Sequence, residues 1–202
     1  MAFPDYFSRI PTITVRDPLA EVLGAANGGL IEYSFTDAVK LCGHACPTVA
    51  GAWLIGVSAL RALYGAETPV RGEIDVALPE AEDSGVAGVT ASVLTLLTGA
   101  AGIGGFKGLA GQFRRNRRLS FATPTISGIR LSRRDTGQSV ECQLDLSHVP
   151  GDPRCGPLLG NILAGQASEA ERSLFAQLWQ QRVERILLDQ AKHPDLVRVK
   201  SV

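Results

Sequence analysis

Apolar residues recur at helical spacing in a long stretch that begins at Pro47 and stops at Gly65. The spaced apolar residues of this stretch are Val49, Trp53, Val57, Leu60 and Tyr64. Proline suits the first turn of a helix, where its missing N–H is no loss, and glycine is a common stop. Because Leu54 and Ile55 make the other side apolar as well, we expect this helix to be largely buried.

Two further stretches predict long helices. Asp83 or Ser84 is suited to cap a second apolar helix, which stops at Gly99. Near the C-terminus, Ser168 and Glu171 form a capping box that opens an amphipathic helix. A helix of this kind suits packing on its own chain and dimerisation equally well, and the pattern does not separate the two.

Alternating apolar and polar residues predict the strands. Four such segments are residues 71–78, 119–122, 129–133 and 140–146. Asp135 to Gly137 is a turn typical of a hairpin between the last two. The order helix, strand, helix and then three mostly antiparallel strands, followed by the C-terminal amphipathic helix, indicates an α+β fold. We expect one domain over residues 1–192 and a loose tail over residues 193–202.

The composition describes a compact, neutral protein. The chain has 20 Lys and Arg residues against 20 Asp and Glu residues, and 45% of its residues are hydrophobic. Binding to nucleic acid or to an anionic membrane depends on surplus basic charge, so we expect neither as a partner. The run from Arg114 to Arg118 is the one strong charge cluster, and we expect it to be a solvated loop tip.

Other features bear on the compartment. Residues 1–15 carry no apolar run behind a basic stretch, so we expect a cytoplasmic chain. The uncharged segment 84–106 is too rich in Gly, Ser and Thr for a membrane span. The chain has 4 cysteines, which are spread from Cys42 to Cys155. This spacing argues against a disulfide framework and favours a metal site or buried thiols.

Reactive side chains concentrate where one helix, capped by Thr36 or Asp37, ends and the helix from Pro47 begins. Four of them fall within seven positions: Lys40, Cys42, His44 and Cys46. A thiolate and an imidazole two residues apart suit zinc or a similar transition ion. The partial positive charge of a helix N-terminus also favours the thiolate of Cys46, which metal binding and nucleophilic chemistry both need. A packed histidine with two inert thiols explains the same spacing.

The ligand count limits the metal hypothesis. A closed zinc site needs four protein ligands, and His44 and Cys46 supply two. If a metal binds, we expect an open site completed by water, by distant residues or by a partner chain. His148, at the end of a predicted strand, is a candidate for completing it.

The motif Gly43-His44-Ala45-Cys46-Pro47, with Leu97-Thr98-Gly99 and Lys107 further on, resembles the FmdE/FwdE-like family, named after a component of formylmethanofuran dehydrogenase. The resemblance covers residues 35–121. It implies a mixed sheet like that of the FwdE/GAPDH domain and a metal site, most often zinc, at His44 and Cys46. Two features depart from the family. Residues 83–93 hold no cysteine, and the chain ends in a helix and tail in place of a cysteine-rich zinc-binding segment.

Glycines gather in the loop that follows the second helix. Residues 99–111 hold six of the 22 glycines, where average usage predicts about 14 in the whole chain. Backbone N–H groups at Gly104 and Gly105, with Lys107 as a point charge, are suited to hold an anionic ligand. The loop lacks the strand and the Ser/Thr of a nucleotide-binding P-loop, so a wall over the metal pocket, or a flexible connection, fits better.

The sequence leaves three functions open. The first is a dimeric metal-binding protein, with zinc expected and iron or haem as alternatives. If it is an enzyme, Cys46 and Lys40 act on a small anionic or carbonyl substrate. The second is a non-catalytic metal carrier or an accessory component of a redox enzyme. The third is a metal-free thiol enzyme that uses Cys46.

Overall fold

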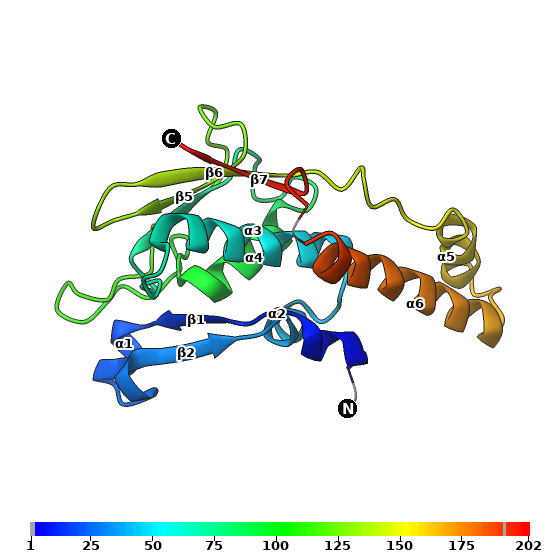
Figure 1. The fold of residues 1–202 in the computed structure, drawn as a ribbon, viewed down its shortest axis with the longest axis horizontal. Helices are drawn as coiled ribbons and strands as arrows, with labels where there is room; N and C mark the ends of the chain where they lie inside the picture. Colours follow the sequence, from blue (N-terminus) through cyan, green and yellow to red (C-terminus); the bar gives the residue numbers. More distant parts are fainter. Residues whose placement is uncertain (1–2, 192) are drawn as a thin grey trace.

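The fold is built around one long helix, α3 (Pro47–Tyr64), that packs against a five-stranded sheet (Figure 1). The computed structural model describes residues 3–191 and 193–202. Pro47 occupies the first turn of α3 and Gly65 ends it, as the sequence predicts, and its side chains are buried on nearly every side. This arrangement of helices and sheets is an α+β fold.

The sheet is mixed. Its strands run in the order β4-β3-β5-β6-β7. The strands are β3 (Ile74–Ala77), β4 (Leu119–Ser120), β5 (Ile129–Arg133), β6 (Ser139–Leu144) and β7 (Val197–Ser201). Strand β4 runs parallel to β3, and the other neighbouring pairs are antiparallel. The three predicted strands that follow the second helix therefore share one sheet with the strand that precedes it.

The remaining elements lie around α3. The N-terminal part contains η1 (Asp5–Arg9), β1 (Ile13–Arg16), α1 (Pro18–Val22), η2 (Asn27–Gly29), β2 (Leu30–Tyr33) and α2 (Phe35–Cys42). Strands β1 and β2 form a separate antiparallel ribbon. The other helices are α4 (Ala87–Thr98), α5 (Cys155–Leu163), α6 (Glu169–Glu184) and a π-helical turn, η3 (Arg185–Asp189). In the part of the chain described, no helix combines the length and apolar character needed to cross a membrane.

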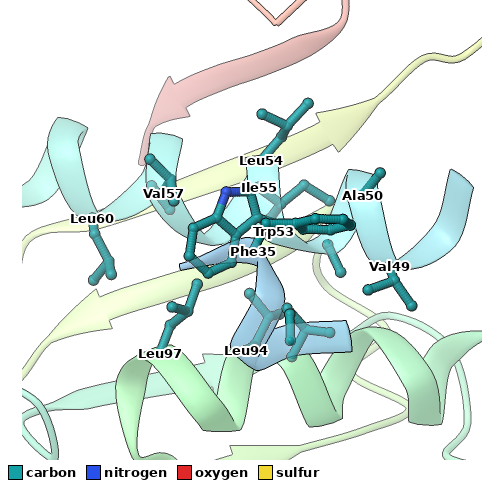
Figure 2. Close-up of a cluster of buried hydrophobic side chains, with 14 of the residues drawn as sticks. Phe35, Val49, Ala50, Trp53, Leu54, Ile55, Val57, Leu60, Leu94 and Leu97 are labelled. Carbon is teal, nitrogen blue, oxygen red and sulfur yellow. The ribbon is translucent and has the colours of Figure 1, made fainter. Parts of the chain in front are cut away.

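The core lies where α2, α3 and α4 meet (Figure 2). The Trp53 side chain of α3 packs edge-on against Phe35 of α2, with 6.2 Å between ring centroids. Leu94 and Leu97 of α4 are fully buried in the same cluster. Gly56 lets α4 approach α3, since a Cβ atom there would lie 2.5 Å from Leu97 Cδ1. The burial expected for this helix is therefore confirmed.

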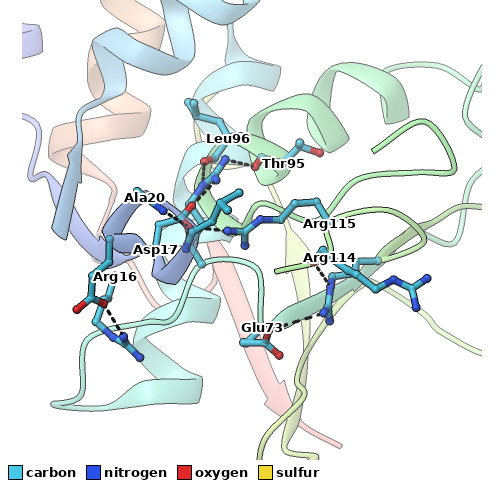
Figure 3. A network of polar contacts seen from close by, with 12 residues as sticks. Arg16, Asp17, Ala20, Glu73, Thr95, Leu96, Arg114 and Arg115 are labelled. Carbon is cyan, nitrogen blue, oxygen red and sulfur yellow. Dashed lines mark hydrogen bonds and ion pairs between the residues drawn. The ribbon is translucent and has the colours of Figure 1, made fainter. Parts of the chain in front are cut away.

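A buried ionic network joins the N-terminal ribbon to the rest of the fold (Figure 3). Asp17 caps α1 and accepts hydrogen bonds from Arg71 at 2.8 Å and from Arg115 at 2.6 Å. Arg71 Nε also donates to the Leu96 carbonyl at the end of α4 at 3.0 Å. The expectation of a solvated arginine tip is therefore wrong for Arg115, which is buried because it meets a buried carboxylate.

The prediction about the C-terminal tail is wrong. The expected loose tail over 193–202 contains β7, whose residues pair with β6 from Val140↔Ser201 to Leu144↔Val197. The alternation Val-Arg-Val-Lys suits such an edge strand, and its backbone bonds hold it in place. Helix α5, for which the sequence pattern gives no prediction, is compatible with Pro157 because that residue lies in the first helical turn, where proline is tolerated.

Two helix starts also differ from the sequence expectation. Ser34, rather than Thr36 or Asp37, caps α2, and Asp37 completes a capping box by accepting from the Ser34 N–H at 2.9 Å. Helix α4 begins at Ala87, after turns that include Ser84. By contrast, the predicted capping box at Ser168 is confirmed.

Candidate functional site

The reactive residues lie at a tight corner between two helices. Helix α2 ends at Cys42, and Gly43 takes a left-handed conformation, with φ of 76°, that a side chain would disfavour. Its N–H donates to the Val39 carbonyl at 2.8 Å and closes the helix. Cys46 is the N-cap of α3. Residues 43–45 therefore form the whole connection between α2 and the N-cap of α3, and His44 lies in it.

His44 is exposed and has one fixed contact. Its Nδ1 atom lies 2.9 Å from the Cys42 carbonyl oxygen. A carbonyl only accepts, so Nδ1 donates, and the neutral ring then carries its lone pair on Nε2. Metal-binding histidines are commonly oriented by a bond of this kind.

Cys46 faces the other way. Its residue is 9% exposed, and its Sγ accepts a hydrogen bond from the Val49 N–H at 3.5 Å. The sulfur therefore lies at the positive end of α3, in the position where a serine or aspartate side chain would cap the helix. Although His44 and Cys46 are two residues apart, one side chain meets solvent and the other lies in the core.

Cys42 is a site residue to which the sequence assigned no role. Burial raises the pKa of its thiol, and the neighbouring Cys46 raises it further. Cys42 and His44 line a shallow depression of about 140 Å³ together with Leu41, Val89 and Ser92. The structure thus brings His44 together with Cys42, while Cys46 lies outside that lining.

Protein ligands for a closed metal site do not gather here. Within residues 3–191 and 193–202, no three His, Cys, Asp or Glu side chains lie close enough together to hold a metal ion. His148, considered as a third ligand, stacks near His193 with 5.5 Å between ring centroids. Any ion held at the corner would therefore take much of its coordination from outside this group of residues.

The predicted lysine and glycine residues lie elsewhere. Lys40 is exposed on α2, with Nζ 3.8 Å from Asp37 Oδ1. Gly104 and Gly105 line a different depression of about 520 Å³, beside Leu119 to Phe121. Lys107 is exposed and borders neither that depression nor the one at His44.

Two residues of α6, distant in the sequence, form hydrogen bonds to the corner between α2 and α3. Trp179 Nε1–H donates to the Ala45 carbonyl at 3.1 Å, and Gln180 Nε2–H donates to the same oxygen at 3.3 Å. Tyr6 in turn donates to Gln180 Oε1 at 2.8 Å. These contacts join residues more than 130 positions apart, so no local pattern predicts them. The only sequence feature that pointed toward these contacts was the predicted amphipathic helix, which carries a tryptophan.

Comparison with known proteins gives a likeness in structure. No family model matches the chain, and no curated protein matches it. Among solved structures, the fold is similar to that of a tungsten formylmethanofuran dehydrogenase FmdE-like protein from Syntrophus aciditrophicus, with a TM-score of 0.42 and 17% identity. The match covers 84% of this chain and 72% of that chain.

Proposed function

We propose that this chain is an FmdE-like metal-binding protein that holds one transition-metal ion, zinc foremost, at the corner between α2 and α3. The observation that carries the proposal is the bond from His44 Nδ1 to the Cys42 carbonyl, because it leaves Nε2 available beside a depression that Cys42 also lines. His44 and Cys46 are the proposed ligands, with Cys42 as a second sulfur beside His44; Cys46 would have to turn its Sγ from the Val49 N–H toward the depression to join them.

The donor set fits such an ion. Imidazole nitrogen and thiolate sulfur are the donors that zinc and iron take in proteins. The cysteine thiols are neighbours, and two negative sulfurs placed together are stabilised by a cation between them. Because no three such ligands gather among residues 3–191 and 193–202, an ion bound by two of them would keep positions open to water or a substrate.

The chain's own residues have defined parts in this proposal. The Cys42 carbonyl orients the His44 ring, and Trp179 and Gln180 fix the Ala45 carbonyl between the two ligands. Lys40, in the last turn of α2, is the proposed partner for an anionic substrate. When bound, the ion supplies Lewis acidity toward a carbonyl group or an activated water molecule.

Metal analysis tests the proposal. Purified protein is expected to hold about one equivalent of zinc, iron or cobalt after loading and gel filtration, and His44→Ala and Cys46→Ala to hold much less. Cys155→Ala, which changes a cysteine on α5, is the matched control and should keep the wild-type content. Circular dichroism verifies that each variant is folded. Unchanged metal content in both site variants would end the proposal.

A non-catalytic accessory role is the second candidate. It is favoured by the hairpin of α5 and α6, which extends away from the body of the protein and carries Leu163 78% exposed (Figure 1). The cobalt-loaded protein separates the two. Azide is expected to shift its visible absorption bands if a coordination position is open to substrate, whereas unmoved bands favour the accessory role.

A further inference from the structure

The loop between α4 and β4, residues 99–118, projects from the body of the protein at the end opposite to α5 (Figure 1). This projecting loop exposes three large apolar side chains: Ile103 is 77% exposed, Phe106 43% and Leu109 44%. Single apolar residues on a surface are ordinary, but three within seven positions of one loop indicate a contact surface.

Backbone hydrogen bonds hold the projecting loop in shape. The Phe106 carbonyl accepts from the Arg115 N–H at 2.8 Å and from the Asn116 N–H at 3.1 Å. Leu109 and Gln112 bond to each other in both directions, at 2.9 and 2.8 Å, and close a hairpin between them. Because these bonds fix where the chain folds back, the apolar side chains are displayed in a defined arrangement.

The loop also holds residues other than glycine in a backbone conformation that side chains disfavour. Ala110, Phe113 and Arg117 have φ of 47°, 58° and 58°. Left-handed backbone at such residues costs free energy, and it concentrates where a segment binds or reacts. The loop therefore keeps its shape at a cost, which a binding role explains.

The projecting loop carries basic residues without acidic partners. Residues 84–134 contain no Asp or Glu. Lys107, Arg114 and Arg117 are exposed, and they form no ion pair among residues 3–191 and 193–202. These three charges lie in the same stretch of the loop as the exposed apolar side chains.

Acidic residues near the loop do not cancel this charge. Asp17, Glu73 and Asp75 are each already paired with two arginines. Glu82 is exposed and borders the depression that residues 103–105 line at the base of the loop. The hairpin from Phe106 to Arg115 contains no carboxylate, so the positive charge gathers toward its tip.

The shape and the charge of the loop favour a lipid surface as its partner. A bilayer accepts projecting apolar side chains without a matching pocket, and anionic headgroups attract the Lys and Arg residues around them. A nucleic acid offers phosphates and bases that stack on aromatic rings, but it would leave the aliphatic Ile103 and Leu109 in water.

We propose that the projecting loop binds the surface of an anionic lipid bilayer. Phe106 and Leu109 enter the headgroup region, and Lys107, Arg114 and Arg117 meet the lipid phosphates. The balanced charge of the whole chain argued against a membrane partner, but it hides this local excess of positive charge. The surface uses no residue of the proposed metal site, so the inference stands independently of the proposed function.

Vesicles of two compositions test the chemistry. Full-length protein with EDTA present is sedimented with vesicles of phosphatidylcholine alone, or of phosphatidylcholine with phosphatidylglycerol, at low and at high NaCl. Binding is expected to be at least tenfold tighter to the anionic vesicles at low salt and to weaken at high salt. Equal binding to the two vesicles, or binding to neither, would overturn the proposal.

Substitutions locate the surface. Lys107→Gln and Arg114→Gln are each expected to weaken binding to anionic vesicles about fivefold, and Phe106→Ser about tenfold. Arg172→Gln is the matched control, because Arg172 is an exposed arginine of α6 that forms no ion pair in the described part of the chain. Circular dichroism verifies folding. Wild-type affinity in every folded loop variant would contradict the assignment.

Two other occupants of the loop have their own signatures. Saturable binding of a single-stranded oligonucleotide without vesicle binding would assign the loop to nucleic acid. A wild-type dimer that Phe106→Ser converts to monomers in light scattering would show that a second copy of the chain covers the loop. Either result would refute the membrane proposal.

Discussion

A single carboxylate, Asp17, joins the N-terminal ribbon to the rest of the protein. It caps α1 and binds two arginines that come from distant parts of the chain (Figure 3). Burial alone would raise the pKa of Asp17, but the hydrogen bond from Arg71 and the charge of Arg115 outweigh burial and hold the pKa below its usual value. Removing the negative charge would leave Arg115 buried without a partner.

Asp17→Asn is therefore expected to lower the free energy of unfolding by about 3–5 kcal/mol, the range for breaking a buried ion pair on one side. Chemical denaturation at neutral pH measures the loss. Asp152→Asn provides a surface control, because Asp152 pairs with Arg154 in solvent, and its unfolding midpoint should stay near that of the wild type. Equal effects of the two substitutions would contradict this view of the network.

The same carboxylate predicts a dependence on pH. Since the pKa of Asp17 is lowered from 3.8 in the folded protein, its contribution to stability is present above pH 3.8 and is lost as the pH falls through the folded value. The difference in unfolding free energy between wild type and Asp17→Asn should therefore shrink in acid. Denaturation curves between pH 7 and pH 2 measure it, and a difference that stays constant would count against the assignment.

At the scale of elements, glycines set how closely α3 approaches its neighbours. A Cβ atom at Gly56 would meet Leu97, which is fully buried in α4 and has nowhere to move. A Cβ atom at Gly51 would overlap Leu144 of β6, but Leu144 lines a pocket of about 610 Å³ and is able to shift into it. The two positions look alike in the sequence and differ in the room behind the neighbouring side chain.

Gly56→Ala is thus expected to destabilise the protein by about 1–3 kcal/mol despite the better helix propensity of alanine. Gly51→Ala should cost less. Gly160→Ala in α5, where nothing lies within 4 Å of the added atom, should instead stabilise by about 0.5–1 kcal/mol. Thermal unfolding of the three variants gives the order, and a destabilising Gly160→Ala would refute it.

Elements with a strong local signal could be predicted from the sequence, and the others could not. Proline and glycine mark both ends of α3, and the capping box marks the start of α6. Strand β7 carries only five residues and gains its stability from pairing with β6, which no local pattern displays. Helix α5 was missed because glycine and proline within it resemble a loop.

The candidate site also has parts that local sequence signals predict and parts that depend on long-range packing. The corner between α2 and α3 follows from Gly43 and Pro47, both of which have local conformational preferences. The burial of Cys46 and the exposure of His44 depend on how α3 packs against the rest of the protein. Their spacing in the sequence suggested a shared site, but in the structure the Cys46 side chain lies in the core and the His44 side chain meets solvent. The contacts from α6 to Ala45 are long-range and lay beyond prediction.

At the scale of the whole molecule, α6 is held to the body along its second half. Trp179 and Gln180 bind the Ala45 carbonyl, and Glu184 forms an ion pair with Arg9. The first half lies against α5 at the far end of the hairpin (Figure 1). The second half of α6 therefore stabilises the corner that carries His44.

Trp179→Phe removes the indole donor and keeps an aromatic ring. We expect a loss of about 0.5–1.5 kcal/mol in unfolding free energy. We also expect faster hydrogen exchange at the Val49 and Ala50 amides, because both donate to Cys46, which directly follows the residue that loses a bond. Phe175→Leu, which alters the aromatic neighbour of Trp179 but no bond to the corner, is the control. Unchanged hydrogen-exchange rates at the corner would show that the bond from Trp179 to the Ala45 carbonyl does not stabilise it.

The bond from Trp179 to Ala45 also gives the protein an optical reporter. The chain has 2 tryptophans, and Trp53 is the other one, buried in the core. In a Trp53→Phe background, indole fluorescence arises from a ring bonded to the residue between His44 and Cys46. Events at the corner then become visible as changes in emission wavelength and quenching, without a label and on the time scale of a stopped-flow mixing experiment.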